Sequence, residues 1–513
     1  MRNNDRMRQW NHVILGILIF SVLAALALSG CNTVGSGQKI RDSNRAAISA
    51  DGRFVAFVSY DPDLRDRLNI DCTDRLCWEV YVTDMETGEM TLASSDSSGQ
   101  PAAAVETTTD VARYPLGGTD LSPFSKAPTS VAISSDGRFV LFSSYTLPPA
   151  NGQALLFRKD MQTGELALVS SSPATSETRA TFFYPAMSSD GRFIAYWIFS
   201  PPTTGRGAKL FVRDMTQASP EPVSLADVLP TGVIAMPNDA PNAVDISLDG
   251  RLIAIHTFLS TSPDSNLSGV FIKDRSSGEV HMISTSSTGE GGNGPSVGAS
   301  ISDDGKLAVF ESGASNLVPE KTCEKIAYSC ANVYLKDVQI GETKLLSKDD
   351  NGAAMNNAVS PVISSDGNSV AFVVVRSISP TDKTEPVTST PAVQETIYLT
   401  DLKTGEMRAV TPEPASPQAT PPTFLQSRAA PALRNVLASY QGIGISADGS
   451  RLVFPALSSW MGMEDRMCHF RRSKGRETPE SLDTTPPDPC IEIFGEDVAS
   501  VEVLRLSTPP PDE

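Results

Sequence analysis

One motif returns seven times along the chain and constrains its fold more than any other feature. It consists of an apolar residue, Ser, any residue, Asp-Gly, a basic or polar residue and then mostly apolar residues, as in 48–57. Self-similarity of this kind is the sequence signature of a repeat architecture. The aspartates of the seven copies are Asp51, Asp136, Asp190, Asp249, Asp304, Asp366 and Asp448.

A second element follows each of the first six copies and resembles residues 80–89, Val-Tyr-Val-Thr-Asp-Met-Glu-Thr-Gly-Glu. A degenerate seventh element at 493–497 keeps the spacing from Asp to Glu502. Asp-Gly between two apolar runs favours a hairpin, because Gly tolerates positive φ and Asp bonds the local backbone. Thr-Gly in the second element marks another hairpin. The relatives of the second element centre on Asp160, Asp214, Asp274, Asp337 and Asp401.

Each repeat therefore predicts four antiparallel strands. Residues 54–58 are apolar at nearly every position, which is typical of strands buried on both faces between neighbouring sheets. We predict an all-β fold, a seven-bladed β-propeller of four-stranded antiparallel blades over residues 45–507. The repeated aspartates are interpreted as structural: Asp51 and its counterparts cap turns, and Asp84 lies near Arg53.

The repeats resemble the WD40-like propeller repeats of the TolB type, in which a Ser-x-Asp-Gly turn is followed by a Tyr-x-x-Asp strand. The resemblance covers residues 45–507 and implies the fold, not the function. TolB carries an extra α/β domain before a six-bladed propeller, and this chain has neither, so no TolB partner or binding residue is transferred. Sialidase-type propellers are excluded, because their Asp-box places one residue between Asp and Gly.

Residues 1–30 are predicted to be a lipoprotein signal peptide. Arginines begin the segment, 13–27 is apolar, and Leu28-Ser29-Gly30-Cys31 resembles a lipobox. The alternative is an uncleaved anchor helix, which also leaves the rest of the chain outside the cytoplasm. Asn32, rather than Asp, after the lipidated Cys31 favours the outer membrane. Residues 31–44 would be the lipidated cysteine and tether, and 508–513 is a Pro-rich tail.

The charge of the chain bears on its partners. The formal net charge is −18, and removing 1–30 takes away three arginines and one aspartate, which gives −20. A chain this acidic without a long basic run argues against nucleic acid as partner. We expect contact with the membrane through acylated Cys31 and with an envelope protein or glycan.

Strand parity indicates which face carries function. Short turns join the first strand to the second and the third to the fourth in each repeat, so the longer connections all leave from the opposite face. These are 60–78, 313–331, 376–394 and 457–489 within repeats, and 95–130 and 412–441 between repeats. Connections this long are functional or disordered in most proteins; neutral drift on one face is the alternative.

Six cysteines besides Cys31 fall in pairs inside three of these connections. Local pairing is the economical arrangement in an oxidising compartment, although fifteen pairings exist in principle. A zinc site is disfavoured because no Cys-x-x-Cys occurs. The predicted disulfides are Cys72 with Cys77, Cys323 with Cys330, and Cys468 with Cys490.

The sequence offers few of the residue combinations that catalytic sites use. His256 and His281 lie in predicted strands, and His469 is the third histidine of the mature chain, so no histidine cluster is present for a zinc site or a Ser-His-Asp arrangement. We therefore expect no catalytic residues, no metal and no cofactor.

Two local patches break the repeat symmetry. Five aspartates crowd residues 61–74 and suggest calcium, but interleaved arginines favour a solvated mixed-charge loop. The second patch is basic and aromatic, and either grips an anionic partner or is an ordinary exposed loop. Its candidate partner-binding residues are Trp460, Arg466, His469, Phe470, Arg471, Arg472, Lys474 and Arg476.

The sequence thus predicts a membrane-anchored cell-envelope lipoprotein that acts as a non-enzymatic, protein- or glycan-binding propeller, facing the periplasm or the cell surface. The alternative is a propeller enzyme, a hydrolase or lyase of an envelope or extracellular glycan. That alternative would need two or more acids with perturbed pKa values converging at the mouth of the central tunnel.

Overall fold

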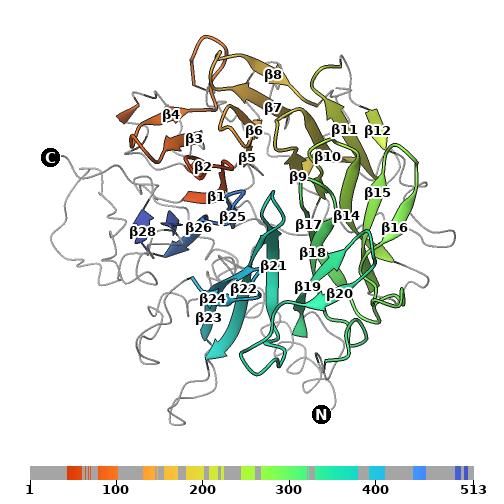
Figure 1. Ribbon diagram of the computed structural model, residues 1–513. Coiled ribbons are helices and arrows are strands. Elements are labelled where there is room, and N and C mark those ends of the chain that lie inside the picture. The colour runs from red at the N-terminus through yellow and green to blue at the C-terminus, as the bar shows by residue number, and fades with distance from the viewer. Residues whose placement is uncertain are drawn as a thin grey trace, which may run out of the picture. The chain divides into compact units, whose positions relative to one another are not determined.

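The computed structural model shows a β-propeller with four-stranded antiparallel blades (Figure 1). The described strands form seven four-stranded sheets, each made from one continuous stretch of chain with its strands hydrogen-bonded in sequence order. The structure describes residues 43–59, 64, 67–68, 70, 79–101, 131–144, 147, 155–170, 181–200, 207–217, 221–223, 244–259, 267–320, 322, 330–378, 392–410, 443–457, 491–497 and 502–505.

The strands begin and end close to the positions that the repeats predict. The first sheet contains β1 (Ser43–Ile48), β2 (Phe54–Ser59), β3 (Glu79–Asp84) and β4 (Met90–Leu92). The second contains β5 (Val131–Ile133), β6 (Phe139–Ser144), β7 (Leu155–Asp160) and β8 (Leu166–Leu168). The third contains β9 (Thr181–Met187), β10 (Phe193–Ser200), β11 (Gly207–Asp214) and β12 (Glu221–Val223). The fourth contains β13 (Val244–Ile246), β14 (Leu252–Leu259), β15 (Leu267–Asp274) and β16 (Val280–Met282).

The remaining three sheets follow the same plan. The fifth contains β17 (Ser296–Ile301), β18 (Leu307–Ser312), β19 (Asn332–Asp337) and β20 (Thr343–Leu345). The sixth contains β21 (Ala358–Ile363), β22 (Ser369–Ile378), β23 (Ala392–Asp401) and β24 (Met407–Ala409). The last contains β25 (Gly444–Ile445), β26 (Arg451–Leu457), β27 (Ile491–Asp497) and β28 (Glu502–Arg505).

One predicted connection is wrong at both ends. We expected a loop over 376–394, but Arg376, Ser377 and Ile378 of β22 pair with Gln394, Val393 and Ala392 of β23. Cross-strand pairing extends both strands into a stretch whose polar residues suggested a loop. The connection between β22 and β23 is therefore 379–391.

The first strand of each sheet contacts the first strand of the next, and β25 contacts β1. Figure 1 shows β1, β5, β9, β17, β21 and β25 gathered around the centre. Among the described strands, β1–β4 and β25–β28 form separate sheets, so the first and last sheets share no strand. The ring is therefore closed by packing between sheets, which includes contacts of β1 with β25, β26 and β27.

The Ser-x-Asp-Gly motif forms the turn between the first and second strands. In the first sheet, the Ser49 hydroxyl donates to Asp51 at 2.5 Å and accepts from the Phe54 N–H at 2.9 Å. Asp51 also accepts from the Arg53 N–H at 3.0 Å. The corresponding serine-to-aspartate bond recurs in the other six sheets, at 2.6–2.8 Å. The repeated aspartates of this motif thus accept hydrogen bonds from the serine hydroxyls and backbone N–H groups of their own turns.

The glycine of this turn also joins neighbouring sheets. Gly137 has φ +73°, and a Cβ there would lie 2.1 Å from the ring of Phe54, which opens the second strand of the preceding sheet. Gly191 meets Phe139 and Gly250 meets Phe193 in the same way. At the closure of the ring, a Cβ on Gly52 would meet Arg451 of the last sheet at 2.5 Å.

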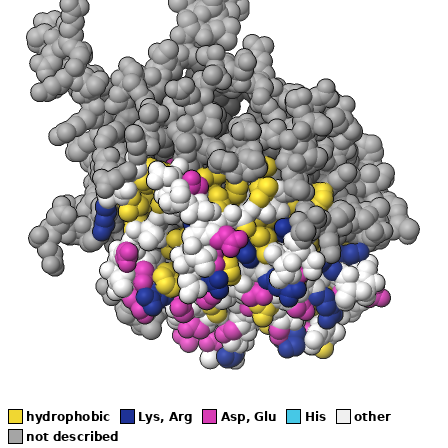
Figure 2. Space-filling view, turned by 90° about the horizontal axis from the view of Figure 1, so that it is seen from above, with side chains coloured by type: hydrophobic (Ala, Val, Ile, Leu, Met, Phe, Trp, Pro, Cys, Tyr) yellow, Lys and Arg dark blue, Asp and Glu magenta, His cyan; other side chains and the backbone are white. Residues whose placement is uncertain are grey.

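Salt bridges tie the two short turns of a sheet together. Arg53, which follows the first turn, holds Asp84 at the start of the second, with Nη2 2.7 Å from Oδ2. Arg138–Asp160, Arg192–Asp214 and Arg251–Asp274 repeat the pair at 2.7–3.0 Å. The hydrogen bond from Arg53 lowers the pKa of Asp84 to about 2. Figure 2 shows acidic and basic side chains interleaved over the described surface that it presents.

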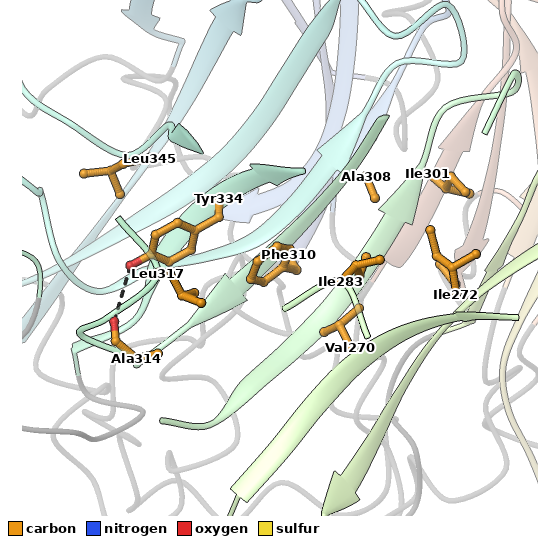
Figure 3. Close-up of a cluster of buried hydrophobic side chains, with 11 residues drawn as sticks. Val270, Ile272, Ile283, Ile301, Ala308, Phe310, Ala314, Leu317, Tyr334 and Leu345 are labelled. Atoms are coloured by element: carbon orange, nitrogen blue, oxygen red, sulfur yellow. Dashed lines mark hydrogen bonds between the residues drawn. The ribbon is translucent and has the colours of Figure 1, made fainter. Parts of the chain in front are cut away.

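Apolar side chains fill the spaces between sheets. In the cluster of Figure 3, Ile272 and Ile283 belong to or follow strands of the fourth sheet, whereas Phe310 and Tyr334 belong to the fifth. The rings of Phe310 and Tyr334 stack with centroids 5.6 Å apart, and the Tyr334 hydroxyl donates to the Ala314 carbonyl. Packing of this kind favours strands that are buried on both faces, as 54–58 suggested.

Gly137 and Gly164 have nearly the same positive φ but different surroundings, so replacing each by Ala distinguishes the cost of backbone strain from the cost of overpacking. Gly164 in the β7–β8 turn has φ +77° with open space around it, whereas Gly137 packs against Phe54. We expect Gly164→Ala to lower the free energy of unfolding by about 1 kcal/mol through backbone strain. Gly137→Ala adds an overpacking cost of about 1–3 kcal/mol. Urea unfolding of both variants would measure the difference, and equal losses would show that the turn glycine does not join the sheets.

Candidate binding site in the central tunnel

The described part of the chain encloses a cavity of about 300 Å³ lined by all seven inner strands or their turns. Polar atoms supply most of its surface, and apolar side chains stand between them. The apolar lining residues include Ile48, Ile133, Met187, Ile246, Ile301, Ile363 and Ile445, each of which lies just before the turn serine of its sheet. The repeat thus places the same kind of side chain around the axis seven times.

The residue between Ser and Asp in each turn forms a collar at one end of this cavity. Ala50 donates its N–H to the Ser135 carbonyl, and Ser135 donates to the Ser189 carbonyl, at 2.9 and 2.7 Å. Further on, Leu248 donates to Asp303, and Asp303 donates to Ser365. Ala447 of the last sheet donates back to the Ala50 carbonyl at 2.9 Å. The collar holds the turn end of the ring together through backbone bonds.

Side chains of the collar also meet across the axis. The Ser189 hydroxyl of the third sheet donates to Asp303 of the fifth at 2.5 Å, and lies 3.4 Å from the Ser365 hydroxyl of the sixth. Because these turns do not belong to adjacent sheets, the contacts narrow the tunnel at its turn end. This position differs from repeat to repeat, so the sequence pattern carried no signal for it.

Two carboxylates face the cavity, and sequence reasoning singled out neither. Asp245 in β13 accepts from the N–H groups of Ile246 and Ile301, both at 2.9 Å, and so links the fourth sheet to the fifth. Burial raises the pKa of Asp245 to about 6, and the negative charge of Asp303 acts in the same direction. Burial also raises the pKa of Asp303, with Asp190 and Asp304 adding to the effect.

No Lys, Arg or His is found among the described residues that line the cavity. Buried lysines elsewhere serve another purpose: Lys336 donates to carbonyl and hydroxyl oxygens of the preceding sheet's turn, including Thr285 and Ser286. Such lysines fasten neighbouring sheets outside the tunnel.

The structure describes only some of the residues that the sequence analysis singled out. Cys330 is disulfide-bonded. His256 is fully buried in β14, and burial lowers its pKa to about 4. His281 is exposed in β16, 3.4 Å from Glu279. The residues outside the described part are Cys31, Cys72, Cys77, Cys323, Cys468, Cys490, Trp460, Arg466, His469, Phe470, Arg471, Arg472, Lys474 and Arg476.

The described residues contain neither a cluster of metal-ligating side chains nor a helix that could span a membrane. No group of three or more His, Cys, Asp or Glu side chains stands close enough to hold a metal ion among them. Within the same residues, no helix has the length and apolar character needed to cross a bilayer.

A further buried acid lies between the fifth and sixth sheets. Glu311 in β18 is 2% exposed and accepts from the Ser360 N–H of β21 at 2.7 Å. Burial raises the pKa of Glu311 to about 7. Its carboxylate therefore links the two sheets through one backbone bond, and its ionised form is costly to bury.

No protein-family model matches the chain, and no curated protein matches it. Similar solved structures include the β-propeller domain of the Trilobed protease from Pyrococcus furiosus, with 11% identity, a TM-score of 0.47, and coverage of 93% of this chain and 100% of that one. Oligogalacturonate lyase from Vibrio parahaemolyticus has 10% identity and a TM-score of 0.45 over 82% and 88% of the two chains. TolB from Acinetobacter baumannii has 15% identity and a TM-score of 0.37 over 84% and 76%. The similarity to these structures concerns the fold alone.

Glu311 leads to a pH-dependent prediction. A carboxyl whose pKa is raised on folding stabilises the fold at low pH, and that contribution is lost as pH rises through the folded pKa. Raising the pKa from 4.5 to about 7 corresponds to about 3 kcal/mol. We expect urea midpoints of the wild type to fall between pH 4.5 and 7, and Glu311→Gln to flatten that fall while still accepting from Ser360. Asp245 acts in the same direction, so the difference between the two proteins isolates Glu311.

The control is Glu165→Gln, which removes an exposed acid from the β7–β8 turn. It should keep the wild-type pH dependence. An unchanged slope in Glu311→Gln would mean that Glu311 titrates at its ordinary value in the folded protein.

Proposed function

We propose that the chain is a cell-envelope lipoprotein, anchored through acylated Cys31, whose seven-bladed propeller binds an envelope protein or glycan without catalysing a reaction. In this proposal the seven sheets close into a single ring, and the binding surface lies on the face opposite the short turns. That face is directed toward the periplasm or the cell surface, whichever contains the partner.

The observation that carries the proposal is the difference between the two ends of the sheets. At one end, every sheet makes a short, saturated Ser-x-Asp-Gly turn, and a backbone collar ties these turns together. The long connections 60–78, 313–331 and 458–490 all join the second strand of a sheet to the third, at the other end. A rigid scaffold that presents its irregular segments from one end is the arrangement that binding proteins use repeatedly.

The chemistry of the tunnel agrees with binding. Asp245 is engaged by two backbone N–H groups and Asp303 by the Ser189 hydroxyl, so each carboxylate already has a positioning role. Among the described residues, no histidine, cysteine or lysine lines the cavity beside them. A Ser-His or Cys-His pair and a Schiff-base lysine are therefore not assembled from these residues.

One observation favours the enzymatic alternative. Asp245 and Asp303 are two acids with raised pKa values that line the same cavity, which is the arrangement a glycan hydrolase or lyase would need. Release of reducing ends or unsaturated sugars from envelope polysaccharide by the wild type, and its loss in Asp245→Asn, would establish that alternative in place of ours.

The binding proposal is tested in cells that express the full chain. We expect labelled palmitate to enter the wild type and not Cys31→Ala. We also expect crosslinking to capture a defined set of envelope partners. Replacing Arg471, Arg472, Lys474 and Arg476 by Ala should reduce that capture about tenfold or more, because the basic cluster supplies the attraction to an anionic partner.

A matched variant removes the same number of charges elsewhere. Lys306, Lys344, Lys348 and Lys403 are exposed on the described surface. Their replacement by Ala should leave partner capture unchanged. Equal capture by the wild type and the 471–476 variant would place the binding surface outside that cluster.

A further inference from the structure

We propose that the seam between the fifth and sixth sheets is a pH-sensitive latch, in which ionisation of Glu311 releases β21 from β18 and opens the wall of the central cavity. A seam here is the surface along which two neighbouring sheets meet. The latch goes beyond the proposed binding function, and it depends on neither the lipid anchor nor the partner.

Backbone N–H groups of β21 hold this seam together. The Ala358 N–H donates to the Ala331 carbonyl of the fifth sheet at 2.9 Å. Two residues on, the Ser360 N–H donates to the Glu311 carboxyl at 2.7 Å. Glu311 is the one ionisable residue of β18, and it is buried. A change in its charge therefore acts directly on the contact between β18 and β21.

The turn end of the same seam is fastened without an ionisable side chain. The Ile363 N–H donates to the Ser300 hydroxyl at 3.3 Å. Beyond it, the collar bond runs from the Asp303 N–H to the Ser365 carbonyl at 3.0 Å, between backbone groups. Neither bond changes when Glu311 ionises. The turn end therefore acts as the hinge, and the opposite end of the seam is the part that opens.

Strained backbone on the β21 side favours release. Ser360 has φ +55°, in the left-handed region that is unfavourable for residues other than glycine. It also precedes Pro361, which favours an extended conformation in the residue before it. The equivalent position of the fifth sheet is Gly298, with φ +62° and a similar shift of strand register. Strain of this kind persists only where the surroundings enforce it, so loss of the Glu311 contact lets β21 relax.

The strands that pack most extensively against β18 leave Glu311 without a charged neighbour. These strands are β17, β19 and β21, and neither β17 nor β21 contains an ionisable residue. In β19, burial raises the pKa of Tyr334 to about 12, which keeps it neutral. Lys336 and Asp337 lie at the turn end of β19, whereas Glu311 pairs with Val333 near the other end. Burial raises the pKa of Glu311 to about 7, and water reaching the carboxylate relieves the cost of its ionised form.

Release of β21 reaches the central cavity, because Val362 and Ile363 of this strand line it. A carboxyl whose pKa is raised in the closed seam stabilises that state at low pH, and the contribution is lost as pH rises from 4.5 to about 7. The pH of the compartment thus controls access to the tunnel through its side wall.

Hydrogen–deuterium exchange of the full chain in detergent, at pH 4.5 and at pH 7.5, tests the latch. Each rate is divided by the intrinsic rate of the same amide at that pH. We expect the protection of peptides covering 356–363 to fall about tenfold or more, because each pH unit between the open and closed pKa values favours the open seam further. Peptides covering 131–144 of the second sheet should keep their protection.

Two variants separate the acid from the strain. Glu311→Gln keeps an acceptor oxygen for the Ser360 N–H and cannot ionise, so the protection of 356–363 should lose its pH dependence. Ser360→Gly keeps the acid and relieves the left-handed strain, so it should raise that protection about threefold or more at both pH values. The matched control, Glu165→Gln, should behave as the wild type. Thermal melting of each variant shows whether it is folded.

Equal protection of 356–363 in the wild type at the two pH values would overturn the latch. An equal fall in the 131–144 peptides, or a fall that persists in folded Glu311→Gln, would also overturn it. If Glu311→Gln does not fold, the wild type and Ser360→Gly decide the question: a fall confined to 356–363 together with raised protection in Ser360→Gly supports the latch, and the absence of either contradicts it.

Discussion

The rest of the structure depends on one local interaction, the hydrogen-bonded turn that Ser-x-Asp-Gly forms between the first two strands of a sheet. Its serine and aspartate bond backbone N–H groups of the same turn, so the turn forms from residues of one repeat. Its glycine has positive φ and no side chain. A side chain of the preceding sheet can therefore pack directly on the turn's backbone, as Phe54 does on Gly137. One short motif therefore sets both the hairpin and the spacing between sheets.

This arrangement also explains how the ring closes without sharing strands between the chain's two ends. Gly52 of the first sheet receives Arg451 of the last, where five other junctions use Phe or Leu and Gly449 meets Ser369. Arg451 Nη1 also donates to the Gly52 carbonyl at 2.9 Å. The collar bond from Ala447 to Ala50 lies beside it. Closure thus uses the two kinds of contact that join other sheets, a side chain packed on a turn glycine and a backbone bond between turns, with an arginine where Gly137, Gly191 and Gly250 meet a phenylalanine.

The two carboxylates of the candidate site lie at positions that the repeat leaves free to vary. Asp245 replaces residues such as Ala47 and Ala132 at the equivalent point of other sheets, and Asp303 occupies a collar position that is Ala, Ser or Leu elsewhere. The seven repeated aspartates are the most conspicuous acids of the sequence, yet each is hydrogen-bonded within its own turn. The two acids that face the tunnel are exceptions within their repeats, and their interest comes from the neighbours that the ring gives them.

The sequence by itself determined the strands, the turns and the salt bridge from Arg53 to Asp84, because these depend on residues close together in one repeat. It also determined that four strands form each sheet. Only the tertiary structure decided that Asp245 and Asp303, 58 positions apart, share one cavity with Ser189 and Ser365, because ring closure brings non-adjacent repeats to a common axis. It likewise decided that Glu311 is buried against Ser360, since packing between sheets, not the pattern along one strand, removes water from that carboxyl.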